Sequence, residues 1–246
     1  MGNGYTSAMK RWLLFSVMIW VAAPAVTLLS QTPFVAPTVD TRMLEPAGEP
    51  PIYYSIFVPD DYKPSRPAPL VLALHFGGNP EGAGRAVLEI LVAQAFKDLG
   101  AVIVAPDSKG RGWSSAANEN AVNLLIDDVF KNYNIDRKKI AVTGFSAGGA
   151  GAWHFGLKYP DRFSAVIPLA GTPPAAGTKW RLPVFAIHSV ADEVVPIGPT
   201  KAFIAELRRE GLRAELVELN GIPHHQTYRF VDGLRRAVPW LKELWK

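Results

Sequence analysis

One short segment constrains the fold of this chain more than any other. Gly144-Phe145-Ser146-Ala147-Gly148-Gly149 stands between a predicted strand over 139–143 and a predicted helix over 147–158. Glycines are required in such a turn, because the neighbouring backbone leaves no space for side chains. The segment therefore predicts a strand that leads directly into a helix, with the Ser146 hydroxyl raised above the sheet. A glycine-rich turn that binds phosphate is the alternative, but the P-loop lysine and the spacing of a dinucleotide fingerprint are missing.

Strand and helix patterns alternate along most of the chain. Short apolar or alternating runs predict strands, and runs with a helical period predict helices. The predicted strands are 52–58, 70–75, 101–105, 139–143, 164–169, 183–188 and 213–219. The predicted helices are 84–99, 118–133, 147–158, 199–210 and 228–245. This alternation predicts an α/β fold with a mostly parallel central sheet, helices on both faces and a site at the carboxyl ends of the strands.

The N-terminal part differs from the rest of the chain. Lys10 and Arg11 precede an apolar run over 12–29, and small residues near 22–25 fit a signal-peptide cleavage site. We interpret 1–30 as a signal peptide or an uncleaved membrane anchor, 31–51 as a Pro-rich linker and 52–246 as one catalytic domain. A cleaved signal predicts a secreted or periplasmic protein. An uncleaved one predicts a protein whose contact with the membrane is made through this segment.

Composition excludes several classes of chemistry. The chain has no cysteine, which excludes disulfides, thiolate nucleophiles and Cys-ligated metals. The net charge is +4, but the basic residues are scattered in short groups without a continuous stripe, so we expect no nucleic-acid partner. We also expect no metal and no cofactor, and the sequence assigns no oligomeric state.

A serine hydroxyl becomes a good nucleophile only beside a base, and the base needs an acid that orients it. Asp192 and the doublet His224-His225 each follow a predicted strand, and they succeed Ser146 in the order serine, acid, histidine. The predicted catalytic residues are therefore Ser146, Asp192 and His224. Glu193 is the alternative acid. His225 is the alternative base, and we otherwise expect it to line the substrate site.

A tetrahedral intermediate also needs two backbone N–H groups aimed at its oxygen. The first is expected from Ala147, directly after the serine. The second is expected from the loop that begins His75-Phe76-Gly77, with Gly77 as the preferred donor and Phe76 as the next. We interpret His75 as structural, because another histidine already fills the role of the base.

These motifs resemble a known family. Ile135-Asp136, the elbow from Thr143 to Gly149, and Tyr159-Pro160-Asp161-Arg162-Phe163-Ser164-Ala165 are similar to the phospholipase/carboxylesterase and feruloyl-esterase-like branch of the α/β-hydrolases. That branch includes polyhydroxybutyrate-depolymerase-like and dienelactone-hydrolase-like proteins, and the resemblance covers about residues 52–245. It implies a serine esterase that forms an acyl-enzyme on Ser146. The chain departs from the branch at Phe76, Ser189 and Pro223, where glycine is usual, and these departures affect the shape of the pocket.

The connection over 170–181 bears on the substrate. It is too short for a helical cap, so we expect an open site without a large lid domain. Trp113 and Trp180 are predicted to supply aromatic walls. Small acyl or aryl esters fit such a site, either free or linked to a polysaccharide. The alternatives are a serine peptidase of the prolyl-oligopeptidase type, which usually carries a gating domain, and a non-catalytic binding module, in which a catalytic residue should be missing.

Overall fold

The computed structural model describes Met1, residues 38–110 and residues 112–246. Except for Met1, the predicted signal peptide or anchor lies outside the described residues, as does the first part of the predicted linker. Within the described ranges, no helix has the length and apolar composition that a membrane span needs. The described residues from 38 onward belong to one compact unit.

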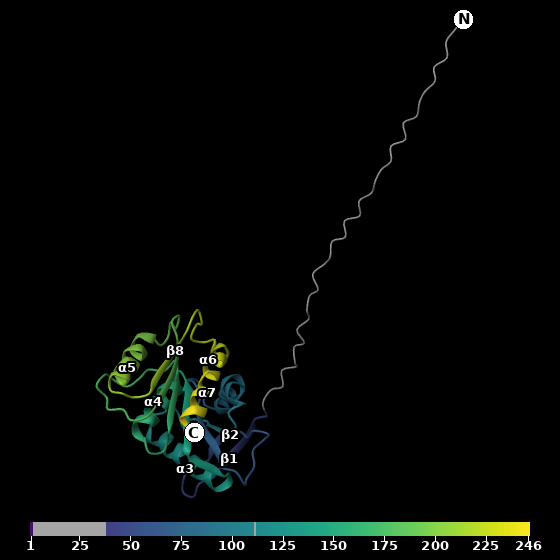
Figure 1. Ribbon diagram of the computed structural model, residues 1–246. Helices are drawn as coiled ribbons and strands as arrows, with labels where there is room; N and C mark the ends of the chain where they lie inside the picture. Colours follow the sequence, from purple (N-terminus) through teal and green to yellow (C-terminus); the bar gives the residue numbers. More distant parts are fainter. Residues whose placement is uncertain (2–37, 111) are drawn as a thin grey trace. The chain divides into compact units, whose positions relative to one another are not determined.

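In the described part of the chain, eight strands form a single sheet in the spatial order β1-β2-β4-β3-β5-β6-β7-β8 (Figure 1). The first two pairings, β1 with β2 and β2 with β4, are antiparallel, and all other neighbours are parallel. The strands are β1 Asp40–Leu44, β2 Ile52–Phe57, β3 Ala68–Leu74, β4 Val102–Pro106, β5 Ile135–Phe145, β6 Ala165–Leu169, β7 Val184–Ser189 and β8 Ala214–Leu219. The prediction of an α/β fold with a mostly parallel sheet is confirmed.

Helices cover both faces of this sheet. They are α1 Ala83–Val87, the π-helical turn η1 Leu88–Val92, α2 Ala93–Phe96, α3 Ala116–Asn132, α4 Ala147–Lys158, α5 Ile197–Arg209, the 3-10 turn η2 Thr227–Phe230, α6 Val231–Arg235 and α7 Ala237–Leu244. One apolar layer joins α3, α4 and α5 to the sheet, and another joins α1, η1, α2, α6 and α7 (Figure 1).

Strand β3 shows why its sequence is apolar throughout. Successive side chains of a strand point to opposite faces. Leu70, Leu72 and Leu74 pack in the layer of α3, α4 and α5, whereas Val71 and Ala73 pack in the opposite layer. A central parallel strand is therefore buried on both sides, and all five of these side chains are fully buried.

Three predictions of secondary structure need correction. The segment predicted as a linker over 31–51 contains β1, which pairs with β2 at the edge of the sheet. The helix predicted over 84–99 is interrupted by η1, and the one predicted over 228–245 is divided into η2, α6 and α7. Pro239 lies in the first turn of α7, where its missing N–H leaves no intrahelical bond unmade.

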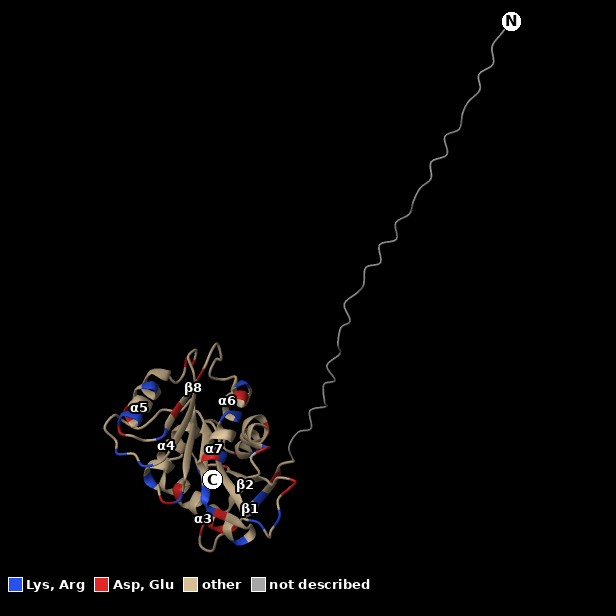
Figure 2. Ribbon diagram, viewed as in Figure 1, with Lys and Arg blue, Asp and Glu red and all other residues tan. Residues whose placement is uncertain are grey.

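Charged residues are interspersed over the outer helices and the loops (Figure 2). Surface pairs such as Arg162–Asp127 and Lys201–Glu218 join residues of opposite sign at 2.9 Å and 2.6 Å. The ribbon in this view shows no continuous basic stripe.

Candidate active site

The candidate nucleophile lies on a tight turn between β5 and α4. Ser146 has a φ of 58°, a conformation that few non-glycine residues adopt, and its N–H donates to the Leu169 carbonyl at 2.9 Å. The turn requires glycine at three positions, and at Gly149 a Cβ would lie 2.3 Å from the Leu169 oxygen. A Cβ on Gly148 would lie 2.0 Å from the Leu74 oxygen, and one on Gly144 would lie 2.4 Å from the Gly148 oxygen. The glycine pattern of the elbow thus has a direct steric cause.

Ser146, His224 and Asp192 come together at the carboxyl ends of β5, β8 and β7. His224 Nε2 lies 2.8 Å from Ser146 Oγ, and His224 Nδ1 lies 2.8 Å and 2.9 Å from the two carboxylate oxygens of Asp192. The Asp192 carboxylate also accepts N–H bonds from Val194 and Val195, at 3.0 Å and 2.7 Å. The imidazole therefore bridges a hydroxyl and a buried, fully hydrogen-bonded carboxylate.

The two alternative residues have different partners. Glu193 accepts a hydrogen bond at 3.1 Å from the backbone N–H of His224 and none from its ring. That N–H bond is the main cause that lowers the pKa of the exposed Glu193 carboxyl. The His225 ring lies 5.4 Å from the His224 ring and almost perpendicular to it. Only His224 of the doublet bridges Ser146 and Asp192.

The loop after β3 is anchored by hydrogen bonds of His75. The N–H of Ser108 donates to His75 Nε2 at 3.0 Å, so in a neutral ring Nδ1 carries the proton and donates to the Phe76 carbonyl at 2.6 Å. Burial lowers the pKa of His75, which favours this neutral form. A Cβ on Gly77 would lie 3.7 Å from the Ala147 Cβ, so the two segments predicted to supply oxyanion donors are neighbours.

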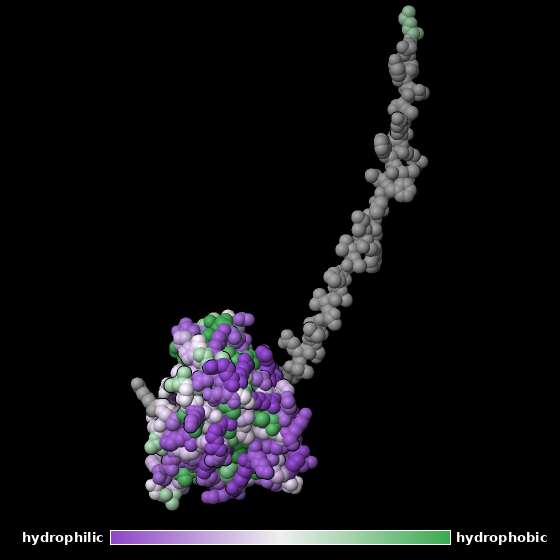
Figure 3. All heavy atoms as spheres, turned by 60° about the vertical axis from the view of Figure 1, so that its left-hand side comes forward, coloured by the Kyte–Doolittle hydropathy of each residue, from purple (hydrophilic) through white to green (hydrophobic). Residues whose placement is uncertain are grey.

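Two hollows flank the loop after β3 and the start of α4. The first, of about 480 Å³, is mostly apolar and is lined by Phe76, Gly77, Ile90, Phe145, Ser146, Val194, His224, His225, Thr227 and Tyr228. The second, of about 410 Å³, is lined by His75, Phe76, Gly77, Gly78, Ser108, Gly110, Gly112, Trp113 and Ala147. Hydrophobic side chains reach the surface at the top of the domain (Figure 3). Near the site, Val190 and Val194 in the loop after β7 and Tyr228 in η2 are exposed.

The two tryptophans lie at different ends of the sheet. Trp113 lines the second hollow, and its Nε1–H donates to the His75 carbonyl at 2.9 Å. Trp180 packs in the core against Trp153 and Phe203, and its ring comes within 2.9 Å of the position that a Cβ on Gly156 would take. Gly156 is ten residues beyond Ser146, about 15 Å along α4. The prediction that Trp180 forms a wall of the site is therefore wrong, whereas Trp113 is adjacent to it.

The sequence did not single out several side chains that line the first hollow. Ile90 comes from η1, and Thr227 and Tyr228 come from η2. The apolar period of the first helix gave no indication that Ile90 reaches the site. Tyr228 lies only four residues after His224, and this short separation was the one sequence feature that could have placed it near the site.

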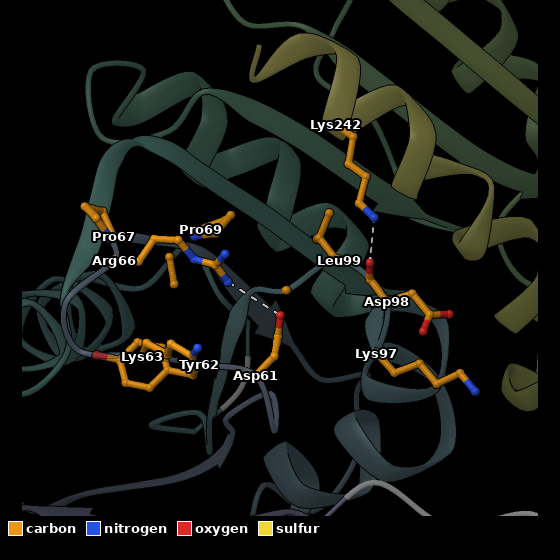
Figure 4. Close-up of a pocket in the computed structure, with 12 residues that line it drawn as sticks. Asp61, Tyr62, Lys63, Arg66, Pro67, Pro69, Lys97, Asp98, Leu99 and Lys242 are labelled. Carbon is orange, nitrogen blue, oxygen red and sulfur yellow. Dashed lines mark hydrogen bonds and ion pairs between the residues drawn. The ribbon is translucent and has the colours of Figure 1, made fainter.

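A further hollow lies at the opposite end of the sheet, near the start of β3 (Figure 4). It measures about 470 Å³, and basic side chains are prominent in its lining. Arg66 pairs with Asp61 at 3.5 Å, and Lys242 donates to the Asp98 carbonyl at 2.8 Å. These are ordinary surface contacts, and none of the candidate catalytic residues lines this hollow. Within the described ranges, no group of three His, Asp or Glu side chains is arranged to hold a metal ion.

Comparison with known proteins identifies the family. Residues 103–238, more than half of the chain, match the family model described as phospholipase/carboxylesterase. The chain belongs to this family. A probable feruloyl esterase C of Aspergillus flavus is 28% identical over 150 residues, which are 58% of this chain and 56% of that protein. Feruloyl esterase C of Emericella nidulans is 27% identical over 151 residues with the same coverage. The chain thus spans little more than half the length of these curated relatives.

Solved structures agree on the fold. A thermostable esterase is similar with a TM-score of 0.70 and 25% identity, over 83% of this chain and 62% of that chain. Esterase Est2 of Thermogutta terrifontis, in its propionate-bound structure, is similar with a TM-score of 0.66 and 18% identity. The similarity covers 85% of this chain and 95% of that chain. The predicted α/β-hydrolase fold is confirmed, and no large lid domain covers the site in the described part of the chain.

Proposed function

We propose that this protein is a serine esterase that hydrolyses carboxylic esters through an acyl-enzyme on Ser146. The observation that carries the proposal is the position of the His224 imidazole, 2.8 Å from the Ser146 hydroxyl and 2.8 Å from the Asp192 carboxylate. A base within hydrogen-bond distance of a hydroxyl, itself oriented by a buried acid, is the arrangement that acyl transfer needs. Membership of the phospholipase/carboxylesterase family supports the same reaction.

In the acylation step, Ser146 Oγ attacks the ester carbonyl carbon while its proton passes to His224 Nε2. The carbonyl oxygen becomes an oxyanion, which the N–H groups of Ala147 and Gly77 stabilise, with that of Phe76 as the alternative second donor. The start of α4 adds a favourable field for negative charge. The intermediate then collapses: the bond to the alcohol oxygen breaks, and His224 returns its proton to that oxygen.

In the deacylation step, water takes the place of the alcohol. His224 removes a proton from the water as its oxygen attacks the acyl carbon, and the bond to Ser146 Oγ breaks in the second collapse. The proton on His224 returns to Ser146, and a carboxylic acid is released. Asp192 remains ionised throughout and stabilises the imidazolium that forms in both steps.

We infer that the substrates are small acyl or aryl esters. The apolar hollow beside Ser146 has about 480 Å³ and includes Phe76 and Phe145, which suits an aromatic ring. The feruloyl esterases among the relatives support aryl esters. We propose such esters both free and linked to a polysaccharide. Because no large lid covers the site in the ranges that the structure describes, His225 and Tyr228 at its rim are accessible to a bulky alcohol group.

The test combines covalent labelling with a substrate panel. A fluorophosphonate probe is expected to label the wild-type protein and to leave Ser146→Ala unlabelled. The panel compares p-nitrophenyl acetate, methyl ferulate, acetylated xylan and a p-nitroanilide peptide. Labelling of a different serine, or ester hydrolysis that is undiminished in Ser146→Ala, contradicts the nucleophile. Faster hydrolysis of the peptide than of every ester favours the peptidase over the esterase.

A further inference from the structure

A second histidine supports the loop that carries Asp192. His188 lies near the end of β7 and is 1% exposed. Its Nε2 lies 2.8 Å from the Val195 carbonyl oxygen, and its Nδ1 lies 3.1 Å from Thr200 Oγ1 on α5. A carbonyl oxygen only accepts, so Nε2 carries the proton, and in the neutral ring Nδ1 accepts from the Thr200 hydroxyl. Burial lowers the pKa of His188, which keeps the ring neutral.

Val195 connects this histidine to the acid. Its carbonyl accepts from His188, and its N–H donates to the Asp192 carboxylate at 2.7 Å. The neighbouring N–H of Val194 donates to the same carboxylate oxygen at 3.0 Å. Removal of the His188 donor therefore leaves a partly buried carbonyl without this partner, on the residue whose N–H holds the acid in place.

The other charged groups near Asp192 face different directions. His224 contacts the carboxylate with its ring, and Glu193 accepts the backbone N–H of His224 on the outside of the loop. His188 Nε2 is 3.5 Å from the nearer carboxylate oxygen, beyond the range of a strong hydrogen bond. His188 lines neither of the two hollows beside Ser146, so its position suits support of Asp192 and its loop and not contact with a substrate.

We propose that His188 is a positioning residue for the reaction: its Nε2–H fixes Val195, and Val195 in turn holds Asp192 against the Nδ1–H of His224. The inference rests on the proposed function, since it assigns a second layer of support to the same catalytic residues. Without this support the carboxylate turns away from the imidazole. The positive charge that develops on His224 during the reaction is then less stabilised, which lowers kcat.

A pair of substitutions separates the two nitrogens of His188. Glutamine places an amide N–H near the position of Nε2, whereas asparagine reaches only the position of Nδ1. We expect His188→Gln to keep kcat for p-nitrophenyl acetate within about threefold of wild type. His188→Asn should lower kcat about 10- to 100-fold, as displacement of a catalytic group does, with KM changed less than about twofold. The shape of its pH profile for kcat should also differ from that of wild type, because the base is then held less firmly by Asp192.

Two controls distinguish positioning from stability. Ile204→Val removes one buried methylene on the same helix as Thr200, and it should lower Tm slightly without moving kcat or the pH profile. In the wild-type protein, histidine ¹⁵N spectra should show His188 as the neutral Nε2–H tautomer over about pH 5 to 8. This measurement applies even if His188→Asn does not fold.

The outcomes are separable from those of the proposed function. An inactive and unlabelled wild-type protein contradicts the proposed function itself. An active wild type with kcat and pH profile unchanged in His188→Asn overturns the inference about His188 alone. Equal losses in His188→Gln and His188→Asn, or an Nδ1–H tautomer in the spectra, also overturn it.

Discussion

Replacement of Gly148 by alanine measures how closely the elbow is packed. Gly148 is the second residue of α4, and an added Cβ would lie 2.0 Å from the Leu74 carbonyl oxygen and 2.7 Å from that of His75. Both oxygens belong to the backbone, so neither can rotate aside as a side chain would. Tolerable contact begins near 3.4 Å. The start of α4 must therefore retreat from β3 by about 1.4 Å.

The cost follows from this retreat. Overpacking against a rigid neighbour costs about 3 kcal/mol or somewhat more, and the better helix propensity of alanine returns up to about 1 kcal/mol. We expect the free energy of unfolding to fall by about 2 kcal/mol and Tm by about 4–8 °C for a domain of this size. The N–H of Ala147 moves with the helix, so kcat should fall about 100-fold.

Gly198 provides the matched control, because it is the second residue of α5 and a Cβ there meets nothing within 4 Å. Gly198→Ala should raise stability by up to about 1 kcal/mol and leave kcat unchanged. Scanning calorimetry and p-nitrophenyl acetate hydrolysis measure both variants. If Gly148→Ala melts at or above the wild-type temperature with undiminished kcat, the steric account of the elbow is refuted.

Three further predictions concern the base, a buried acid and the N-terminus. His224→Ala should lower kcat about 10³-fold or more and His225→Ala only about tenfold; a larger loss at His225 would show that the base is assigned to the wrong residue. Glu119 bonds to Lys158 first and also to His154 and Tyr159, and these contacts lower its pKa from 4.5 to about 2. The stabilisation from these contacts is present above pH 4.5 and is lost as the pH falls toward 2. Glu119→Gln should therefore lower the free energy of unfolding by about 1–2 kcal/mol at pH 7. In acid-unfolding curves, this difference from wild type should disappear near pH 2. Mass spectrometry of the exported protein should give an N-terminus within about residues 24–35, whereas an intact Met1 on membrane-bound protein favours the anchor.

All seven strands that the sequence predicted are present, with ends displaced by a few residues. Most of them are covered on both faces and are marked by a continuous apolar run. Strand β8 is the exception, because it lies at an edge of the sheet and exposes Glu215 and Glu218. Strand β1 was not predicted. It lies at the edge of the sheet, and the pattern Asp40-Thr41-Arg42-Met43-Leu44 is mostly exposed. Backbone pairing with β2 holds such a strand, and its side chains carry little information about that pairing.

Trp113 and Trp180 show what position along a strand can predict. Trp113 follows β4, so it lies at the carboxyl edge of the sheet beside the elbow. Trp180 closely precedes β7, which places it toward the amino edge, away from Ser146. The alternation of strands and helices therefore contained enough information to separate them. The error was to treat the whole connection between β6 and β7 as one loop near the site, although its two ends lie at opposite edges of the sheet.

The order of residues along the chain also limits what could be predicted about the acid. Asp192 and Glu193 are neighbours, and their carboxylates have different partners: one contacts the His224 ring and the other the His224 backbone N–H. Both contacts join segments about thirty residues apart, so no local pattern distinguishes them. The contacts of His188 are different in kind, because Val195 and Thr200 lie only 7 and 12 residues further along. When a strand is followed by a short loop and a helix that packs beside it, the last side chains of the strand contact that loop and helix. Support of the acid by its own loop is therefore the part of the site most open to prediction, whereas its pairing with the base depends on how the whole sheet is assembled.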